Sequence, residues 1–281
     1  MLKQRVITAL VLLAILLPAL FYPSPVPFAA VALVFMGAGA WEWGRLNGLA
    51  GAASVGLGAV CVAMCGAAWA TGWLHQPLPW LWAIGGGAWV LGGALLLRGG
   101  VAGWPHVPRA LRVVGGVLAL WLAWLAVAQA RVAGINYLLS VLTLVWMADI
   151  AAYFAGRAFG LRFTRSKLAP AISPGKSWEG VWGGMLGVLL LAVCWAWADA
   201  HWHAQVSSLY SHLARRGWWL LPIGAVFMAA MSVVGDLVES LIKRSAGVKD
   251  SSGLLPGHGG VLDRIDALLP TLPLAMMLSQ F

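Results

Sequence analysis

The chain has 281 residues, of which 61% are hydrophobic and only 10% are charged. Soluble globular proteins carry roughly 25% charged residues, so this composition excludes an ordinary soluble domain and indicates an integral membrane protein. The net charge is +9, and the Lys and Arg residues that cause it lie in loops between the apolar segments. This distribution favours anionic lipids and phosphorylated substrates as partners and argues against nucleic acid.

Apolar runs long enough to cross ~30 Å of hydrocarbon recur from one end of the chain to the other. The first follows two cations, as in a secretory signal, but more apolar segments come after it, so we expect an uncleaved first span. We predict an all-α, polytopic integral membrane protein with about nine transmembrane helices, near residues 6–21, 28–43, 52–73, 80–97, 113–130, 137–154, 181–198, 218–234 and 265–278.

The spans divide into two expected units. Residues 1–135 hold about five N-terminal spans, and residues 136–281 form a C-terminal transmembrane unit with polar loops at 157–180 and 235–266. Within the second unit, Gly183 and Gly187 form a small-residue pattern that predicts close helix packing.

Loop charge predicts which side faces the cell interior. If the N-terminus is cytoplasmic, all but three of the 18 Lys and Arg residues fall in cytoplasmic segments, the exceptions being Arg131, Arg215 and Arg216. This asymmetry follows the positive-inside rule, so we expect a cytoplasmic N-terminus and both polar loops on the cytoplasmic face of a bacterial-type inner membrane.

The carboxylates are few and concentrated. Asp149 lies within the sixth apolar run, while Asp236 and Glu239 end the eighth, and Asp263 and Asp266 open the ninth. Each of these two pairs is three residues apart, so its members share a helix face. Carboxylates at neighbouring helix ends could hold one or two divalent cations, and Mg²⁺ prefers such oxygen ligands. The alternative is that these acids only form ion pairs with Lys243, Arg157 or Arg264.

The loop between these pairs, KDSSGLLPGHGG (residues 249–260), has the composition of a phosphate-binding segment. Its glycines allow tight turns, and the helix start near Asp263 should offer backbone amides to an anion. His258 either acts as a general acid or hydrogen-bond donor or has a structural place in the turn. In the other loop, Lys176 sits in a Pro/Gly turn beside Glu179, while Arg162 and Arg165 could serve only to set the topology.

Three stretches together resemble one known family. The string SLIKRSAGVKDSSGLLPGHGGVLDRID (240–266), with DIAAYFAGRAFG (149–160) and SPGKSWEG (173–180), is similar to the signature of phosphatidate cytidylyltransferases, also called CDP-diacylglycerol synthases. The similarity covers roughly residues 146–268. In the first five spans, only Trp41-Glu42 shows a further, weak similarity to the family.

The resemblance implies a nucleotidyltransferase that uses CTP and phosphatidic acid to form CDP-diacylglycerol and pyrophosphate, with Mg²⁺ as cofactor. By this resemblance the catalytic residues are Asp236, Asp263, Lys249 and His258, and the metal ligands are Asp236, Asp263, Asp266 and Glu239. The substrate-binding residues are Lys243, Arg244, Arg264, Lys176, Arg157, Asp149, Glu179, Ser240, Asp250, Gly259 and Gly260. A homodimer is compatible with this assignment.

Two other functions fit parts of the pattern. An enzyme that transfers from CTP to another lipid, such as an isoprenoid phosphate or alcohol, would need a similar charged site. A transporter or channel would also place carboxylates in its spans, but it predicts charges near the bilayer midplane rather than at one face.

Overall fold

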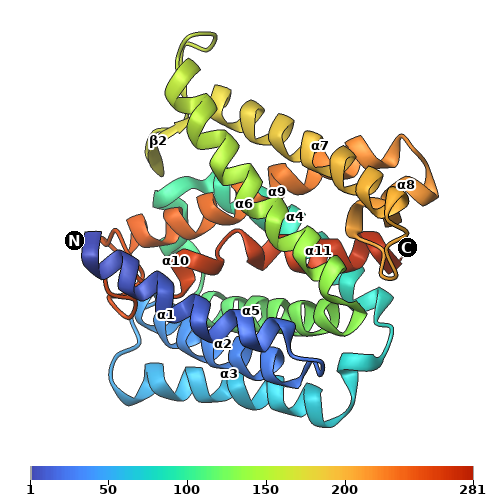
Figure 1. Ribbon diagram of the computed structural model, residues 1–281. Coiled ribbons are helices and arrows are strands. Elements are labelled where there is room, and N and C mark those ends of the chain that lie inside the picture. Colours follow the sequence, from blue (N-terminus) through green and yellow to red (C-terminus); the bar gives the residue numbers. More distant parts are fainter. Residues whose placement is uncertain (1, 281) are drawn as a thin grey trace.

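The computed structural model describes residues 2–280 (Figure 1). Within that range eight helices are long and apolar enough to cross a membrane. They match the first eight predicted spans: α1 (Leu2–Phe21), α2 (Val26–Leu46), α3 (Ala52–Ala70), α4 (Pro79–Gly103), α5 (Arg109–Ala133), α6 (Ile135–Phe159), α7 (Trp178–His201) and α9 (Leu220–Ser245). The prediction of a helical, polytopic membrane protein is therefore confirmed.

The predicted ninth span has a different form. After the short helix α10 (Leu262–Ile265), the chain forms α11 (Leu268–Gln280), which has 13 residues and contains Pro273. At 1.5 Å per residue it is about 20 Å long, shorter than the hydrocarbon layer. It packs against α4, α5 and α9, and Leu274 is fully buried. This last helix is covered by protein and needs less length than one facing lipid.

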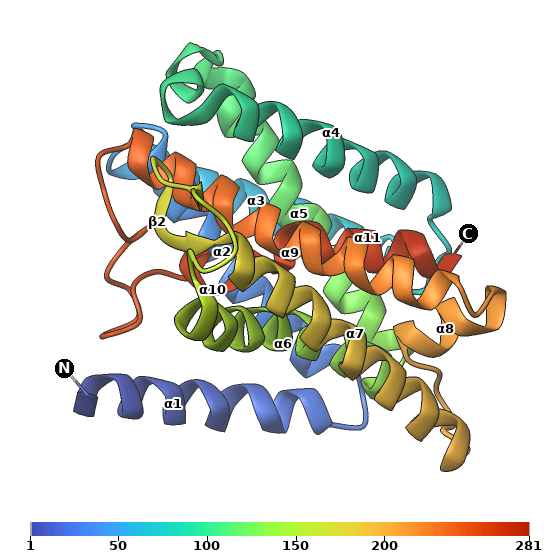
Figure 2. The ribbon, with the colours of Figure 1, turned by 90° about the horizontal axis from the view of Figure 1, so that it is seen from above.

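Helices α2, α3, α6 and α11 pack against α5, which is largely buried from Gly116 to Arg131 and lies between other helices in both views (Figures 1 and 2). The Trp124 indole on α5 donates to the carbonyl of Ala29 on α2 over 3.1 Å, which ties two of these helices together. Large apolar side chains such as Val34 and Ile84 point outward with about 70% of their surface exposed, as expected for helix faces that contact lipid.

Helix α1 lies along the edge of this bundle (Figure 2). Two of its polar side chains reach the loop between α9 and α10, where Arg5 donates to the Gly257 carbonyl and Thr8 to the Pro256 carbonyl. The start of α1 and the end of α11 lie at opposite ends of the bundle (Figure 1). The start of α1 and the end of α9 therefore share one end of the bundle.

The close approach predicted for Gly183 and Gly187 is present between α6 and α7. A Cβ atom on Gly183 would lie 2.1 Å from the Cβ of Ala155, and one on Gly187 would lie 2.5 Å from the Cβ of Ala151. No side chain larger than hydrogen fits at either position, so the two helices can touch here only through glycine.

The basic loop before α7 contains a two-stranded antiparallel hairpin, β1 (Lys167–Ala169) and β2 (Ser173–Ser177), in which Lys167 is opposite Ser177. The sequence prediction included no strands. At the end of β2 the Ser177 hydroxyl accepts a hydrogen bond from the Gly180 amide and caps α7. This turn from strand to helix brings Lys176 toward α9.

At the opposite end of the bundle, the short helix α8 (Leu209–Arg216) follows α7. Asp199 accepts hydrogen bonds from Asn136, Ser208 and Ser211, so its carboxylate joins α6, α7 and the start of α8. The 3₁₀ turns η1 (Trp73–His75) and η2 (Trp104–His106) complete the described elements.

Candidate active site

A polar cavity of about 340 Å³ lies where α6, α9 and α10 approach the loop after α9. Its lining combines carboxylates with Lys and Arg side chains, and all of its residues are among the predicted site residues. They are Asp149, Asp236, Ser240, Lys243, Arg244, Lys249, Asp250, Asp263, Arg264 and Asp266. The structure thus brings together residues that span more than a hundred positions of the chain.

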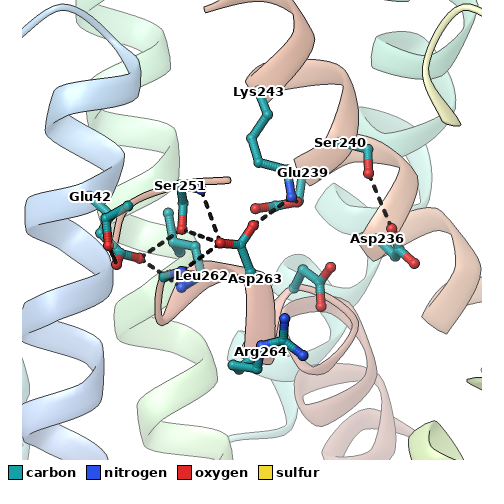
Figure 3. A network of polar contacts seen from close by, with 12 residues as sticks. Glu42, Asp236, Glu239, Ser240, Lys243, Ser251, Leu262, Asp263 and Arg264 are labelled. Carbon is teal, nitrogen blue, oxygen red and sulfur yellow. Dashed lines mark hydrogen bonds and ion pairs between the residues drawn. The ribbon is translucent and has the colours of Figure 1, made fainter. Parts of the chain in front are cut away.

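Lys243 links the two predicted carboxylate pairs (Figure 3). Its Nζ atom lies 2.5 Å from Asp263 Oδ1 and 2.5 Å from Glu239 Oε2, and all three side chains are largely buried. These two acids thus form ion pairs with Lys243, while Asp263 also lines the cavity. Glu239, though on the predicted helix face, does not line the cavity.

Asp263 is held from both sides (Figure 3). While Oδ1 faces Lys243, Oδ2 accepts hydrogen bonds from the Ser251 amide at 3.0 Å, the Ser251 hydroxyl at 2.9 Å and the Gly260 amide at 2.7 Å. Burial alone would raise the pKa of Asp263, but the Lys243 contact and the amide donors outweigh it and lower the pKa below its usual range. The carboxylate is therefore ionised and rigidly oriented.

Asp236 lies across the cavity from Asp263 and has its own cation. Its Oδ2 lies 2.5 Å from Lys176 Nζ, and its Oδ1 accepts a hydrogen bond from Ser240 at 3.3 Å. Lys176 comes from β2, so the hairpin contributes directly to the site. Both side chains are about one quarter exposed, which leaves them accessible to a ligand.

Asp266 is half-buried near Asp236 and has few compensating contacts. Its Oδ1 accepts from the Ala267 amide at 2.8 Å. Burial and then the negative charge of Asp236 raise the pKa of Asp266 to about 7. Together with Asp149 from α6, these carboxylates repel one another and would be stabilised by a cation.

Within residues 2–280, no group of three or more His, Cys, Asp or Glu side chains could hold a metal ion by itself. Mg²⁺ usually takes only one or two carboxylates and completes its ligands with water and substrate phosphates. The oxygen donors of this cavity therefore fit an ion that binds together with a phosphorylated substrate.

The remaining cations surround the cavity at its exposed rim. Arg264 donates twice to the His258 carbonyl, at 2.7 and 3.1 Å, and Arg244 donates weakly to the Ile172 carbonyl at 3.4 Å. The exposed Lys249 completes the set. Exposed cations of this kind suit the oxygens of a polyphosphate.

Several predicted residues lie outside the cavity lining and contact protein instead. Glu179 accepts three hydrogen bonds from Phe163 and Thr164, and so organises the hairpin loop. The exposed Arg157 donates to the Tyr153 hydroxyl. The His258 ring has a buried Nδ1 atom without a hydrogen-bond partner in the described chain.

The backbone amides at the start of α10 are not free for an anion, contrary to the expectation from sequence. The amides of Gly260, Val261 and Leu262 donate to Asp263 or Glu42. Gly259 and Gly260 therefore make room for carboxylates of the protein in this structure. A Cβ atom on Gly259 would lie 2.7 Å from Asp263 Oδ2.

The sequence interpretation named Glu42 only as part of a weak similarity to the family and gave it no role in the site. This side chain on α2 is fully buried and accepts four hydrogen bonds, three from the loop before α10 and one from the first amide of α10, the helix that carries Asp263. A single carboxylate inside an apolar span was the available signal, because such residues are costly in a membrane and mark function.

Fold and site together define a polytopic helical membrane protein with a phosphate-compatible cavity of carboxylates and cations at one end of its bundle. The chain belongs to the cytidylyltransferase family, whose family model matches residues 3–281. It is 40% identical to the phosphatidate cytidylyltransferase of Pseudomonas aeruginosa over 97% of this chain and 95% of the relative. It is 37% identical to that of Haemophilus influenzae, over 97% and 96% respectively.

Proposed function

We propose that this protein transfers CMP from CTP to phosphatidic acid, forming CDP-diacylglycerol and pyrophosphate. The observation that carries the proposal is the cavity lined by Asp236, Asp263, Lys243 and Arg264. Lys176, outside that lining, forms an ion pair with Asp236. Its mixture of charges suits a reaction between two phosphates. Relatives that match almost the whole chain and bear the name of this activity support it.

The chemistry needs positioning and charge neutralisation more than a nucleophile from the protein. An oxygen of the lipid phosphate attacks the α-phosphorus of CTP, a new P–O bond forms, and the bond to the bridging oxygen breaks to release pyrophosphate. Lys243, Lys249 and Arg264 would neutralise the charge that develops on the leaving pyrophosphate. Arg244 and Lys176 would hold the other phosphate oxygens.

We infer that the site uses Mg²⁺, which would neutralise phosphate charge and orient the triphosphate. Asp236, Asp263 and Asp266 line the cavity and would supply its protein ligands, with Asp149 facing the same space. Glu239 would act indirectly, by orienting Lys243. A second ion is compatible with the number of carboxylates.

We place the site on the cytoplasmic face of a bacterial inner membrane, with the N-terminus on the same side. The distribution of Lys and Arg supports this orientation. CTP is a cytoplasmic substrate, and a site at the ends of helices can receive a lipid from the adjoining leaflet.

The test is a transfer assay with purified protein and CTP labelled on its α-phosphate. We expect label in the lipid fraction and one pyrophosphate released per lipid formed, only when both CTP and phosphatidic acid are present. Asp263→Asn should reduce turnover by at least about 1000-fold, because it removes the charge held between Lys243 and the amides.

An isoprenoid phosphate provides the second arm of this assay. Labelling of the isoprenoid phosphate without labelling of phosphatidic acid would contradict the proposed substrate and identify the alternative cytidylyltransferase. Asp199→Asn, at the far end of the bundle, is the matched control and should retain activity.

A further inference from the structure

Glu42 is an acidic residue buried within the helical bundle at the end of α2. Its Oε2 atom accepts from the Ser251 hydroxyl at 3.1 Å and the Leu262 amide at 2.8 Å. Its Oε1 atom accepts from the Ser252 hydroxyl at 2.5 Å and the Val261 amide at 2.9 Å. Three of these donors belong to the loop that links α9 to α10, and the Leu262 amide begins α10 itself; Figure 3 shows Glu42 facing Ser251 and Leu262.

Ser251 connects Glu42 to the proposed active site. Its hydroxyl lies 3.1 Å from Glu42 Oε2 and 2.9 Å from Asp263 Oδ2, and its amide donates to the same Asp263 oxygen. A hydroxyl has a single proton to donate, so the two carboxylates share it. Any movement of Glu42 therefore changes the hydrogen bonding of Asp263.

The loop is shaped to the Glu42 carboxylate. A Cβ atom on Gly260 would lie 2.0 Å from the Ser251 hydroxyl oxygen and 2.5 Å from Glu42 Oε1. Glycine thus lets the backbone close over both groups. The amides of Val261 and Leu262, at the start of α10, then face Glu42 and set the direction in which α10 presents Asp263 and Arg264 to the cavity.

We propose that Glu42 is a positioning residue for cytidylyl transfer, acting through Ser251 on Asp263. The proposal rests on the proposed function for its kinetic consequence. Glu42 touches no residue of the cavity lining other than through this loop, so its effect is indirect. It also makes α2, in the N-terminal half of the chain, part of the machinery that shapes the site.

The carboxylate form is what the four donors require. A glutamine at this position keeps one acceptor oxygen but presents an NH₂ group to two donors that then lack an acceptor. Glu42→Gln should therefore loosen the loop without adding bulk. Aspartate keeps both carboxylate oxygens on a shorter side chain, so Glu42→Asp should keep part of the loop's hydrogen bonding.

The first measurement is steady-state kinetics of the full-length protein in detergent micelles with CTP and phosphatidic acid. We expect Glu42→Gln to lower kcat by about 100-fold, because misplacement of a reacting group by about 1 Å has an effect of that size. The KM for CTP should change by less than about threefold, since the cations at the rim remain. Glu42→Asp should recover at least about tenfold of the lost rate.

A double-mutant cycle with Ser251→Ala tests whether Glu42 acts on Asp263 through Ser251. If Glu42 acts through Ser251, the double variant should be no slower than Glu42→Gln alone, within about threefold. Losses that multiply would overturn the proposal, as would an unchanged kcat in Glu42→Gln. If Glu42→Gln does not fold, Glu42→Asp and Ser251→Ala carry the same cycle.

The matched control is Asp199→Asn, another carboxylate that accepts four hydrogen bonds, at the far end of the bundle. It should destabilise the fold to a similar extent and keep kcat within about twofold. An equal loss of kcat in Asp199→Asn would mean that Glu42 has only a structural role.

Hydrogen exchange supplies a readout that needs no substrate. Glu42→Gln should speed exchange of the Val261 and Leu262 amides by at least about tenfold, and Asp199→Asn should not. Unchanged exchange would overturn the inference even if the enzyme is active. Faster exchange in a protein without transfer activity would contradict the proposed function and leave the loop-positioning role of Glu42 in place.

Discussion

At the scale of single residues, the site is organised by a few side chains that each hold several partners. Lys243 is shared by Asp263 and Glu239, and Ser251 is shared by Asp263 and Glu42. Such shared groups make the carboxylates depend on one another. A substitution of one of these residues should therefore change the ion pairs or hydrogen bonds of the carboxylate that shares its partner.

Lys243→Met tests this dependence. It leaves Glu239 and Asp263 buried without their common cation, so we expect a loss of about 3 kcal/mol in the free energy of unfolding. Adding Glu239→Gln should restore part of that loss, because the neutral amide needs no counter-ion. Chemical unfolding in detergent measures both effects, with the exposed Lys3→Met as the control. Equal stability of Lys243→Met and wild type would show that the ion pair contributes nothing.

The response to pH should follow Asp266. Because burial and Asp236 raise the pKa of Asp266 to about 7, this carboxyl is protonated below that pH and cannot bind a cation well. Apparent Mg²⁺ affinity should therefore increase as the pH rises from about 6 to about 8, by up to about tenfold per pH unit below the pKa. Mg²⁺ titrations of turnover at several pH values measure it.

Asp266→Asn is the control for this pH effect, since CTP itself also titrates in this range. The variant should bind Mg²⁺ more weakly and lose the part of the pH dependence that comes from the protein. A chelator should stop the wild-type reaction, and added Mg²⁺ should restore it. Full activity in the presence of chelator would contradict the Mg²⁺ proposal.

At the scale of elements, the contact between α6 and α7 positions Asp149 and the hairpin that carries Lys176. Gly183→Ala would place a methyl group 2.1 Å from the Cβ of Ala155, which the two helices can relieve only by moving apart. We expect a loss of about 1–3 kcal/mol in stability and weaker CTP binding. Thermal unfolding in detergent and nucleotide titration measure these effects.

Gly87→Ala on α4 is the matched control, because a Cβ atom there meets nothing within 4 Å. It should be neutral or slightly stabilising, since alanine has the higher helix propensity. Equal destabilisation by both substitutions would mean that the α6–α7 contact is not specially tight.

At the scale of the whole molecule, the eight long helices of residues 2–280 and the short α11 leave the start of α1 and the end of α11 at opposite ends of the bundle (Figure 1). Under the proposed orientation, Arg165→Cys should react with an impermeant maleimide only after the membrane is opened. Arg215→Cys on α8 should react in intact cells. A Cys194→Ser background removes the exposed native thiol. The reverse labelling pattern would show that the orientation is opposite to the proposed one.

Much of this arrangement follows from local sequence patterns. Hydropathy predicts the eight long helices, because a segment of about 20 apolar residues has few alternatives to a spanning helix. The polar loops at 157–180 and 235–266 predict the residue types of the cavity. The glycine spacing at 183 and 187 predicts a close helix contact, since residues four apart share a helix face, and the structure makes α6 the partner.

The sequence by itself thus determined the membrane class, the first eight predicted spans and the charged residues that line the cavity. Only the tertiary structure decided which charges pair, that α10 amides serve carboxylates, and that Glu42 supports a loop 209 to 220 residues away. The physical reason is the distance along the chain over which each interaction acts. Hydropathy and helix periodicity act between near neighbours, whereas hydrogen bonds across the bundle depend on how its helices pack.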